Sequence, residues 1–346
     1  MRAARLHGPR DLRVEEVADL GISPDEVLLR VRSAAICATD VRIFAFGDRR
    51  VRYPVILGHE IAGDVETVGS ELRGLVEEGT RVVVNPTVSC GRCRFCSSGR
   101  QELCQEIRTV GIHLDGGLAQ LARVPGIVLG QRGLYAIPED VTYDEAALTE
   151  PLSCCIHGQA LARVAAGETV VVIGAGAIGL MHAMLAKHAG SRRVIAVETD
   201  PQRLRQAGEF GCDVLLNPSE QSFSHRLSEA TDGEGADVVI VAAGSAEAQR
   251  EAFLSAGVGG RIVFFAGLPP GQGEVGLNTN LIHYRELSVL GSYASTPHEM
   301  ERALELVQSH SLQLEKLITH RFPLEKSAEA FQVASSRAGL KVAVHP

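Results

Sequence analysis

The sequence predicts an α/β protein in which a β-rich region precedes a doubly wound parallel sheet. Short runs of alternating polarity, such as Glu26–Val31 and Arg81–Val84, are separated by glycine and proline in the first part of the chain. From Thr169 onward, unbroken apolar runs alternate with helical stretches. Unbroken apolar strands that alternate with helices are typical of a parallel sheet covered on both faces.

The second region can be followed element by element. An apolar strand at 170–173 leads through glycines into a helix at Ala177–His188, and the strand Arg193–Val197 leads into the helix Pro201–Phe210. Two further apolar strands are predicted at Asp237–Ala242 and Arg261–Phe265. After about residue 290 the pattern becomes mixed again, with an amphipathic helix at Pro297–His310 and short elements up to Val344.

The bulk composition is that of a globular protein. The 346 residues are 45% apolar and 22% charged, with a formal net charge of −8. This charge does not favour nucleic acid or an anionic membrane surface as a partner. We find neither an apolar run long enough to span a membrane nor a secretory signal in the first residues, so the expected compartment is the cytoplasm.

Four of the eight cysteines form a tight cluster with the spacing C-x2-C-x2-C-x7-C, at Cys90, Cys93, Cys96 and Cys104. Two-residue gaps let thiolates in tight turns converge on one ion, and four thiolates describe a closed structural zinc site. Gly91 and Gly99 supply the conformational freedom that such turns need. An iron–sulfur cluster is the alternative, but the order of the gaps differs from common ferredoxin runs.

A glycine loop follows the apolar strand at 170–173. Gly174, Gly176 and Gly179 stand in G-x-G-x-x-G spacing, and Ala177 and Ile178 open the helix. Between a strand and a helix this pattern predicts a dinucleotide site, with the pyrophosphate at the helix N-terminus. The parallel-sheet region is therefore interpreted as a Rossmann domain.

An acidic residue after the second strand bears on the choice of dinucleotide. Glu198 follows Gly179 at the distance at which a carboxylate binds the adenosine ribose hydroxyls and repels a 2′-phosphate, which favours NAD. Asp200 is a competing candidate for this contact. Arg203, one helical turn further on, is expected to flank the adenine or to tolerate a phosphate.

Three short motifs complete the pattern: Cys37 in I-C-A-T-D, His59 and Glu60 in L-G-H-E, and Glu150 in T-E-P-L. Together with the cysteine cluster and the glycine loop, in this order, they resemble the zinc-dependent medium-chain dehydrogenase/reductase family over essentially the whole chain. Within that family the chain resembles the sorbitol and other polyol dehydrogenases most closely. The resemblance implies a β-rich GroES-like catalytic domain at 1–151, to which 293–346 return, and a Rossmann domain at 152–292.

The resemblance also assigns roles to matching positions. Cys37 and His59 look like ligands of a catalytic zinc, and Glu60 and Glu150 look like its acidic partners, one of them direct and the other direct or through water. Asp40 looks like the carboxylate that orients His59, although it could equally be an acid at a helix start. In such a site, three protein ligands leave a position for the substrate oxygen, and zinc lowers the pKa of the alcohol.

A proton relay must accompany hydride transfer. Thr39 matches the relay hydroxyl of the family, two residues after the zinc cysteine. The family often has a histidine three residues further on, but this chain has Arg42. Because arginine cannot accept a proton at neutral pH, the relay must end at the cofactor ribose and water or use another group.

Further cofactor contacts are implied by the resemblance alone. Cys154 is expected near the nicotinamide, or else in the core. Ser292 and Tyr293 match the segment whose backbone meets the carboxamide of the coenzyme. Lys341 matches a basic position near the pyrophosphate, or else is a solvated lysine. Two further positions are assigned to binding the dinucleotide, Ala266 and Gly267.

The implied function is NAD-linked oxidation of a secondary alcohol in a polyol or sugar derivative. Arg42, with its neighbours Arg49, Arg50 and Arg52, forms either a solvated basic loop or a clamp for a substrate phosphate or carboxylate, and His113 is a further candidate for the pocket. A sugar-acid or sugar-phosphate dehydrogenase and an amino-alcohol enzyme resembling threonine dehydrogenase are the nearby alternatives. A zinc-free quinone reductase and a catalytically silent scaffold are the distant ones. The resemblance favours a homotetramer over a dimer, with two zinc ions in each chain.

Overall fold

The computed structural model describes residues 1–18 and 20–346. The chain divides into two compact units. The first contains residues 1–153, 295–310 and 314–346, and the second contains residues 154–294 and 311–313. The sequence prediction placed the two boundaries at 151/152 and 292/293.

The first unit is built on antiparallel strands. A seven-stranded sheet has the path β10-β6-β5-β3-β18-β17, with β9 also paired to β3, and a three-stranded sheet has the order β2-β1-β4. These strands are β1 (Arg2–Gly8), β2 (Asp11–Glu16), β3 (Glu26–Ala35), β4 (Val55–Ile56), β5 (Glu60–Val68), β6 (Arg81–Val84), β9 (Leu121–Pro125), β10 (Leu134–Ala136), β17 (Ile318–Pro323) and β18 (Lys341–His345). Alternating polarity along β3 buries Val27, Leu29 and Val31 in one core.

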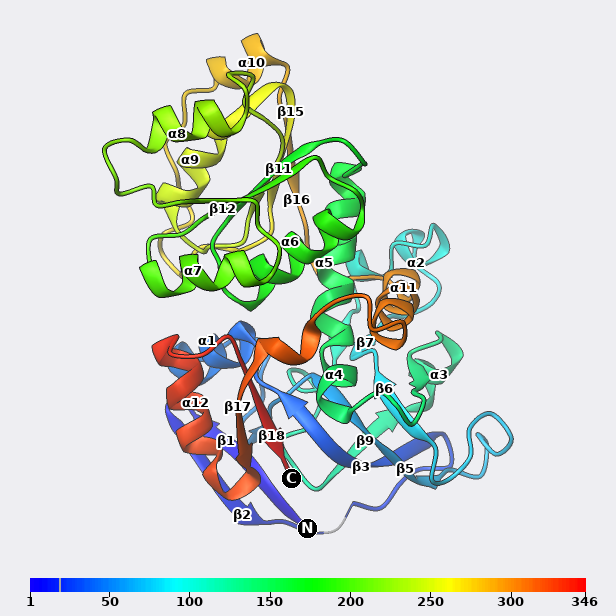
Figure 1. Ribbon diagram of the computed structural model, residues 1–346. Coiled ribbons are helices and arrows are strands. Elements are labelled where there is room, and N and C mark those ends of the chain that lie inside the picture. Colours follow the sequence, from blue (N-terminus) through cyan, green and yellow to red (C-terminus); the bar gives the residue numbers. More distant parts are fainter. Residues whose placement is uncertain (19) are drawn as a thin grey trace. The chain divides into compact units, whose positions relative to one another are not determined.

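The C-terminal residues complete the sheet of the first unit. Strand β18 pairs with β3 through Ala343 opposite Ala35, and β17 runs parallel to β18. Helix α12 (Ser327–Ser336) packs on both of these strands (Figure 1) and buries Phe331 completely. The end of the chain therefore supplies two strands and a helix to the core that the N-terminal residues begin.

The remaining elements of the first unit are short pieces and helices: α1 (Ala38–Phe46), β7 (Thr87–Val88), α2 (Arg94–Ser97), β8 (Arg108–Thr109), α3 (Gly126–Gly130), α4 (Tyr143–Ala147), the start of α5 (Thr149–Ala162), and α11 (Pro297–Gln308). Helix α4 begins at a capping box, in which the Thr142 side chain and the Glu145 side chain each bond the other's backbone N–H. Helix α11 begins in the same way at Thr296 and Glu299.

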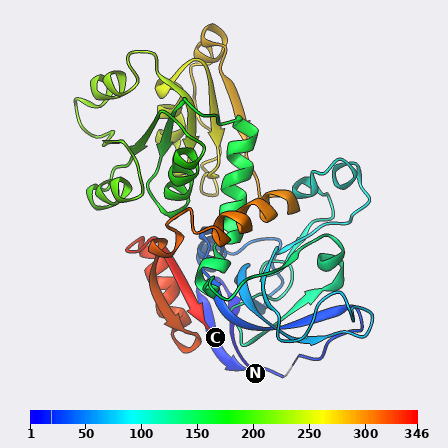
Figure 2. The same cartoon turned by 45° about the vertical axis from the view of Figure 1, so that its right-hand side comes forward.

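The second unit is a six-stranded parallel sheet with the order β13-β12-β11-β14-β15-β16. Its elements are β11 (Thr169–Ile173), α6 (Ala177–His188), β12 (Arg193–Val197), α7 (Pro201–Glu209), β13 (Val214–Leu216), α8 (Phe223–Ala230), β14 (Ala236–Val241), α9 (Ala246–Ser255), β15 (Ala256–Phe264), α10 (Asn280–Arg285) and β16 (Ser288–Gly291). Right-handed crossovers put α6 and α7 on one face and α8, α9 and α10 on the other. Helices flank this sheet in both views (Figures 1 and 2).

The predicted fold class is confirmed. Every residue of β11 is buried, as expected for a central parallel strand. The sequence pattern missed β13 because three residues are too short for a periodic signal. It also began the fourth strand too late, at Arg261 instead of Ala256, because Gly257, Gly259 and Gly260 weaken the strand signal there.

Among the described residues, no helix has the length and apolar content to cross a membrane.

Candidate functional site

Three chemically reactive side chains meet in the first unit. Cys37 is the N-cap of α1, and His59 and Glu60 stand where β5 begins. One ligand atom of each residue lies within 4.8 Å of those of the other two. A thiolate, an imidazole and a carboxylate at such separations form a donor set that suits a zinc ion.

Asp40 holds two of these residues in place. Its carboxylate accepts a hydrogen bond from the backbone N–H of Cys37 at 2.9 Å and lies 3.3 Å from His59 Nδ1. It also accepts from the backbone N–H of Gly58 at 3.4 Å, and it is completely buried. With Asp40 on the Nδ1 side, Nε2 is the ring nitrogen that remains for a metal.

The loop before His59 depends on a close backbone approach. Gly58 has a φ of +92°. A Cβ on Gly111 would lie 2.4 Å from the Gly58 carbonyl oxygen and 2.9 Å from the His59 nitrogen. Glycine at both positions therefore allows the loop that contains Gly111 to press against the backbone at His59.

The electrostatics of His59 fit a bound cation. Burial alone would lower its pKa, but the charges of Asp40 and Cys37 raise the pKa well above its ordinary value. The surrounding groups thus stabilise positive charge at this ring. A zinc ion at Nε2 would supply that charge in place of a proton, so the residues present fit the metal.

Lys341 is the buried counterion of Glu60. Its ammonium donates to both carboxylate oxygens of Glu60, and Nζ lies 3.5 Å from the carbonyl oxygen of Ile36, directly before Cys37. Burial opposes the charged ammonium, but Glu60 and Cys37 raise the pKa of Lys341. Lys341 is buried, so the alternative of a solvated lysine is wrong, and the pyrophosphate role that the resemblance assigned to it stays a prediction.

Glu150 and Thr39 lie in the same unit, in the first turns of α5 and α1. The charge of Glu150 contributes to the raised pKa of Lys341, which places its carboxylate near this group. Of the two predicted acidic partners, only Glu60 belongs to the set whose ligand atoms lie within 4.8 Å of one another among the described residues. Which glutamate binds the metal stays a prediction.

The arginines before the L-G-H-E motif are not equivalent. Arg50 makes two side-chain hydrogen bonds to the carboxylate of Asp48, at 2.9 and 2.8 Å, whereas Arg42 lies 3.8 Å from that carboxylate. Arg49 and Arg52 are exposed. The hydrogen bonds from Arg50, with a smaller contribution from Arg42, lower the pKa of Asp48 to about 2. The sequence pattern did not single out Asp48. The negative charge of this carboxylate partly neutralises the positive charge of the proposed anion clamp.

His113 accepts a hydrogen bond at Nδ1 from the backbone N–H of Thr109, at 3.0 Å. Burial, followed by the charge of Arg50, lowers the pKa of His113. The ring is therefore neutral near pH 7 and carries its proton on Nε2. The charges of Arg50 and Asp48 both affect the pKa of His113, so His113 lies near the loop that contains these two residues.

The four cysteines of the predicted structural site converge. Cys93 Sγ lies 3.5 Å from Cys96 Sγ, and Cys90 Sγ lies 3.9 Å from Cys96 Sγ. A tetrahedron with zinc–sulfur bonds of about 2.3 Å has sulfur–sulfur distances of about 3.8 Å. Backbone N–H groups of Cys96 and Phe95 help lower the pKa of Cys93 to about 6, which favours a thiolate. The set therefore fits a closed zinc site.

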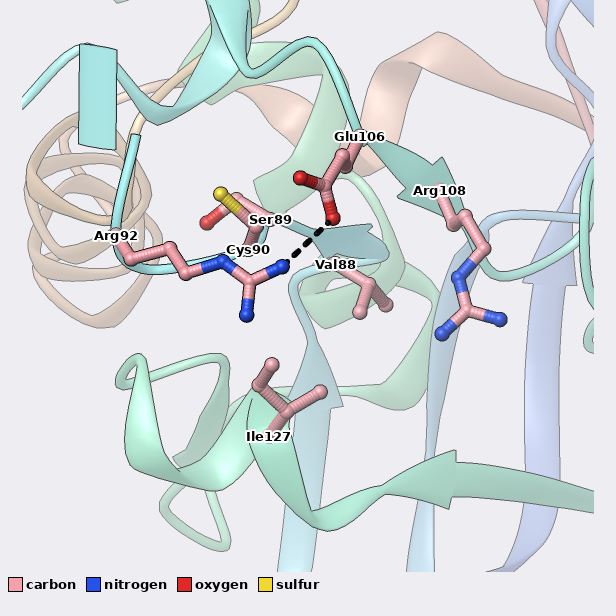
Figure 3. A pocket seen from close by; sticks show the side chains of 7 residues that line it. All are labelled: Val88, Ser89, Cys90, Arg92, Glu106, Arg108 and Ile127. Atoms are coloured by element: carbon pink, nitrogen blue, oxygen red, sulfur yellow. Dashed lines mark hydrogen bonds and ion pairs between the residues drawn. The ribbon is translucent and has the colours of Figure 1, made fainter. Parts of the chain in front are cut away.

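Glycine has the predicted function in the turns of this lobe, since Gly91 and Gly99 have φ values of +71° and +75°. A pocket of about 400 Å³ lies beside the lobe, lined by Val88, Ser89, Cys90, Arg92, Glu106, Arg108 and Ile127. In Figure 3, Arg92 reaches across to Glu106, at 3.4 Å, while Arg108 points away from this pair. The lining contains none of the residues of the Cys37 cluster.

The glycine loop of the second unit has the expected geometry. Gly174 has a φ of +102°, and Gly176 caps α6, which begins at Ala177 and Ile178. A Cβ on Gly179 would lie 1.8 Å from the Gly174 carbonyl oxygen, so only glycine lets α6 pack this closely on the loop. The N-terminal backbone N–H groups of α6 thus border an open glycine turn, as an anion site requires.

The acids after β12 have different partners. Glu198 accepts hydrogen bonds from the backbone N–H groups of Ala175 at 2.9 Å and Thr199 at 2.7 Å. Asp200, the competing candidate for the ribose, is the N-cap of α7 and accepts hydrogen bonds from the backbone N–H groups of Gln202 and Arg203. Helix capping therefore engages Asp200, while Glu198 stands against the glycine loop.

Arg203 also borders this loop, because its guanidinium nitrogen lies 3.6 Å from the point where a Cβ on Gly176 would stand. Ala266 and Gly267 follow the end of β15, and Ser292 and Tyr293 follow the end of β16. Cys154 is half-buried on α5. All of these residues belong to the second unit, and their cofactor contacts stay predictions.

Sequence reasoning missed Asp48 and the pairing of Glu60 with Lys341. A signal for the second existed, because Lys341 opens the otherwise apolar run K-V-A-V. A lysine that begins a buried strand must have a buried partner.

Comparison with known proteins agrees with the family resemblance that the sequence motifs indicate. Residues 23–131 match the family model described as the alcohol dehydrogenase GroES-like domain, and residues 177–309 match that of the zinc-binding dehydrogenases. The sorbitol dehydrogenase of Bacillus subtilis (strain 168) is 33% identical over 100% of this chain and 97% of its own length. An L-threonine 3-dehydrogenase of Vibrio parahaemolyticus is 30% identical over 98% of this chain and 97% of its own.

Solved structures give the same result. A structure described as a zinc-binding dehydrogenase from Sinorhizobium meliloti 1021, bound to NADP, has a TM-score of 0.91 at 33% identity and covers 100% of this chain and 99% of its own. Galactitol-1-phosphate dehydrogenase from Escherichia coli has a TM-score of 0.91 at 27% identity, with 100% of both chains covered. The two metal-binding clusters, the glycine loop and these full-length similarities show that the chain belongs to the zinc-dependent alcohol dehydrogenases of the medium-chain dehydrogenase/reductase family.

Proposed function

We propose that this protein is an NAD-dependent, zinc-dependent dehydrogenase that acts on a secondary alcohol of a polyol or sugar derivative. One observation carries the proposal. The ligand atoms of Cys37, His59 and Glu60 lie within 4.8 Å of one another, and the Asp40 carboxylate lies 3.3 Å from His59 Nδ1. The same chain contains a dinucleotide-type glycine loop, so it has both of the groups that alcohol oxidation by hydride transfer needs.

In the proposed reaction each residue has a defined task. A zinc ion bound by Cys37, His59 and a glutamate would supply Lewis acidity to the substrate hydroxyl. Asp40 keeps His59 in the tautomer that leaves Nε2 for the metal. Thr39, one residue before Asp40, accepts the hydroxyl proton and passes it to the cofactor ribose and water, because Arg42 cannot accept it.

Two features support a polyol as the substrate. Glu150 stands in the T-E-P-L motif that contributes to the resemblance to polyol dehydrogenases, and sorbitol dehydrogenases are among the relatives at about a third identity. A substrate with a phosphate or carboxylate is the second candidate. It is favoured by Arg42, which lies 3.8 Å from Asp48 while Arg50 holds that carboxylate more closely. An amino alcohol is the third, from the similarity to L-threonine 3-dehydrogenases.

We propose NAD as the coenzyme because the Glu198 carboxylate stands beside the glycine loop, where it would repel a 2′-phosphate. Arg203 lies beside the same loop and would attract such a phosphate, and a related structure contains NADP. Measurement of kcat/KM with both coenzymes on one substrate decides between them. The proposed compartment is the cytoplasm, which agrees with the use of four cysteines as metal ligands.

We also propose a homo-oligomer, with a tetramer favoured over a dimer. Strand β16 is an edge of the six-stranded sheet, and Ser288, Val289 and Gly291 on it are exposed. Val258 and Tyr284 are 80% and 77% exposed. An exposed, partly apolar edge strand suits pairing with a second copy, and a tetramer needs a second interface. Sedimentation equilibrium measures the assembly, and Val289→Lys is expected to weaken it.

The deciding experiment is an activity screen with both coenzymes over polyols, sugar acids, sugar phosphates and amino alcohols. We expect a preferred polyol or sugar derivative, two zinc ions in each chain by elemental analysis, and loss of activity on chelation. Zinc-replete protein that binds the coenzyme but oxidises no member of the panel would instead support a scaffold. Activity that survives removal of all zinc would contradict the proposed mechanism.

A further inference from the structure

One carboxylate in the loop after α1 is approached unequally by two guanidinium groups. Arg50 donates to Asp48 from its backbone N–H and Nε, both at 2.9 Å, and from Nη2 at 2.8 Å. Arg42 Nη2 lies 3.8 Å from the same carboxylate, and its side chain makes no hydrogen bond to any described residue. The side chains of Asp48, Arg50 and Arg42 are 14%, 26% and 43% exposed. Arg42 is therefore the guanidinium that stays open to a ligand.

Two stretches of backbone connect this group of charges to the candidate metal site. Arg42 is in α1, whose N-cap is Cys37, so about 7.5 Å along the helix axis separates the two residues. A Cβ on Gly111 would lie 2.9 Å from the backbone nitrogen of His59. His113, whose pKa responds to the charges of the loop after α1, is two residues further along. The charged loop and the metal ligands are therefore held by the same two segments of the first unit.

The charges that meet at Asp48 do not cancel. Hydrogen bonds from Arg50 help to lower the pKa of Asp48 to about 2, so its carboxylate is ionised near pH 7. The two guanidinium groups and the one carboxylate leave one positive charge, which belongs in effect to Arg42. Arg49 and Arg52 are exposed, and their charges are screened by water and salt.

We propose that Asp48 is a specificity-determining residue, which engages Arg50 and leaves Arg42 as the single open positive charge, and thereby selects a sugar acid with one carboxylate over a sugar phosphate. A carboxylate has one negative charge at pH 8, whereas a phosphate ester has close to two. A guanidinium pairs with a carboxylate through two parallel hydrogen bonds, and this pair leaves no net charge. A phosphate at the same place would retain an uncompensated charge beside Asp48.

This inference rests on the proposed function, because it names which anion such a dehydrogenase would oxidise. It also makes a prediction about variants that follows from charge alone. Asp48→Asn leaves two positive charges. Arg50→Gln leaves none, because Asp48 then loses its closer partner and pairs with Arg42. The double variant Asp48→Asn/Arg50→Gln returns the group to one positive charge.

The chain also contains a matched control. Arg13 donates to the carboxylate of Asp11 from Nε and Nη2, at 2.8 and 2.6 Å, in the same two-residue arrangement as Arg50 and Asp48. This pair is exposed on β2, with 43% of the aspartate and 59% of the arginine side chain accessible. Asp11→Asn therefore removes the same charge from the same kind of pair without altering the group at Arg42.

The experiment measures kcat/KM for aldonates, alditol phosphates and neutral alditols of equal chain length, with full-length zinc-loaded protein at pH 8 and low ionic strength. Each value for an anion is divided by that for the alditol. We expect the wild type to prefer the aldonate to the phosphate. Arg50→Gln should lower the aldonate ratio about tenfold, and the double variant should restore it. Because Coulomb energy doubles with ligand charge, a gain of about threefold for the aldonate in Asp48→Asn implies a gain of about tenfold for the phosphate.

A wild-type preference for phosphates, no recovery in the double variant, or equal changes in Asp11→Asn would overturn the proposal. The wild-type preference and Asp48→Asn decide the matter even if Arg50→Gln does not fold. Wild-type protein that oxidises alditols but neither anion would overturn this inference and leave the proposed function standing. Zinc-replete protein that oxidises no member of the three classes with either coenzyme would instead overturn the proposed function.

Discussion

The ammonium of Lys341 contacts both carboxylate oxygens of Glu60, and their side chains are only 5% and 0% exposed. Removal of one partner from such a pair leaves an uncompensated buried charge. We therefore expect Lys341→Met to lower the free energy of unfolding by about 3–5 kcal/mol. The double variant Glu60→Gln/Lys341→Met should be more stable than Lys341→Met, as urea titration can measure. If the stability lost by the double variant equals the sum of the losses of Glu60→Gln and Lys341→Met, the two side chains are not coupled, which would argue against the ion pair.

The cysteine lobe should bind one zinc ion independently of the Cys37 cluster. Replacement of Cys93 by serine should reduce the zinc content from two ions to one and lower the melting temperature, because a closed site contributes directly to folding. Cys212 is buried outside both clusters, so Cys212→Ala is the matched control and should retain two ions. The measurement is elemental analysis alongside thermal unfolding, and unchanged zinc in the Cys93 variant would contradict the assignment.

Coenzyme choice should depend on Glu198. The variant Glu198→Gln retains an oxygen for the backbone N–H groups but removes the charge, so the ratio of kcat/KM for NAD to that for NADP should fall about tenfold or more. Asp200→Ala is the control. Since Asp200 caps α7, that variant should lose about 1 kcal/mol of stability and keep its coenzyme preference. The opposite pattern would assign the ribose contact to Asp200.

Stability at acid pH should depend on Asp144. Burial opposes its charge, but hydrogen bonds from His345, Ser33 and Arg321 lower the pKa from 3.8 to about 2. Because the pKa of Asp144 is lower in the folded chain than in the unfolded chain, the charged carboxylate stabilises the fold by about 2 kcal/mol above pH 4. This contribution disappears as the pH falls toward 2 and the carboxylate is protonated. Urea titrations between pH 2 and pH 6 should show a flatter slope for Asp144→Asn. An unchanged slope would mean that the native and unfolded pKa values are alike.

An anionic substrate, if the activity screen identifies one, should depend on Arg42. We expect Arg42→Ala to raise the KM for that substrate about tenfold and to leave the KM for a neutral polyol unchanged, because a charged hydrogen bond is lost only in the first case. Arg52→Ala is the control, since that residue is an exposed arginine in the loop that follows α1. Equal effects of the two variants would indicate general electrostatic attraction and not a clamp.

Much of the architecture could be predicted because it is encoded locally. The apolar run at 170–173, the glycines after it and the helix Ala177–His188 follow one another directly, so periodicity and turn chemistry suffice. Strand β13 has three residues and carries no periodic signal. The glycines in β15 similarly hid its start, because Ala256 pairs with Ala236 of β14 but the glycines that follow it have little strand propensity.

The sequence by itself determined the two sites whose residues are close together in the chain, the four-cysteine lobe and the glycine loop. Spacing and backbone conformation define both, as the positive φ values of Gly91, Gly99 and Gly174 show. Only the tertiary structure decided which buried groups surround Cys37, His59 and Glu60. Lys341 and Glu60 are 281 positions apart, and the pairing of β3 with both β18 and β5 brings them together. A long-range ion pair of this kind leaves no periodic trace in the sequence, because burial and charge compensation are properties of the assembled core.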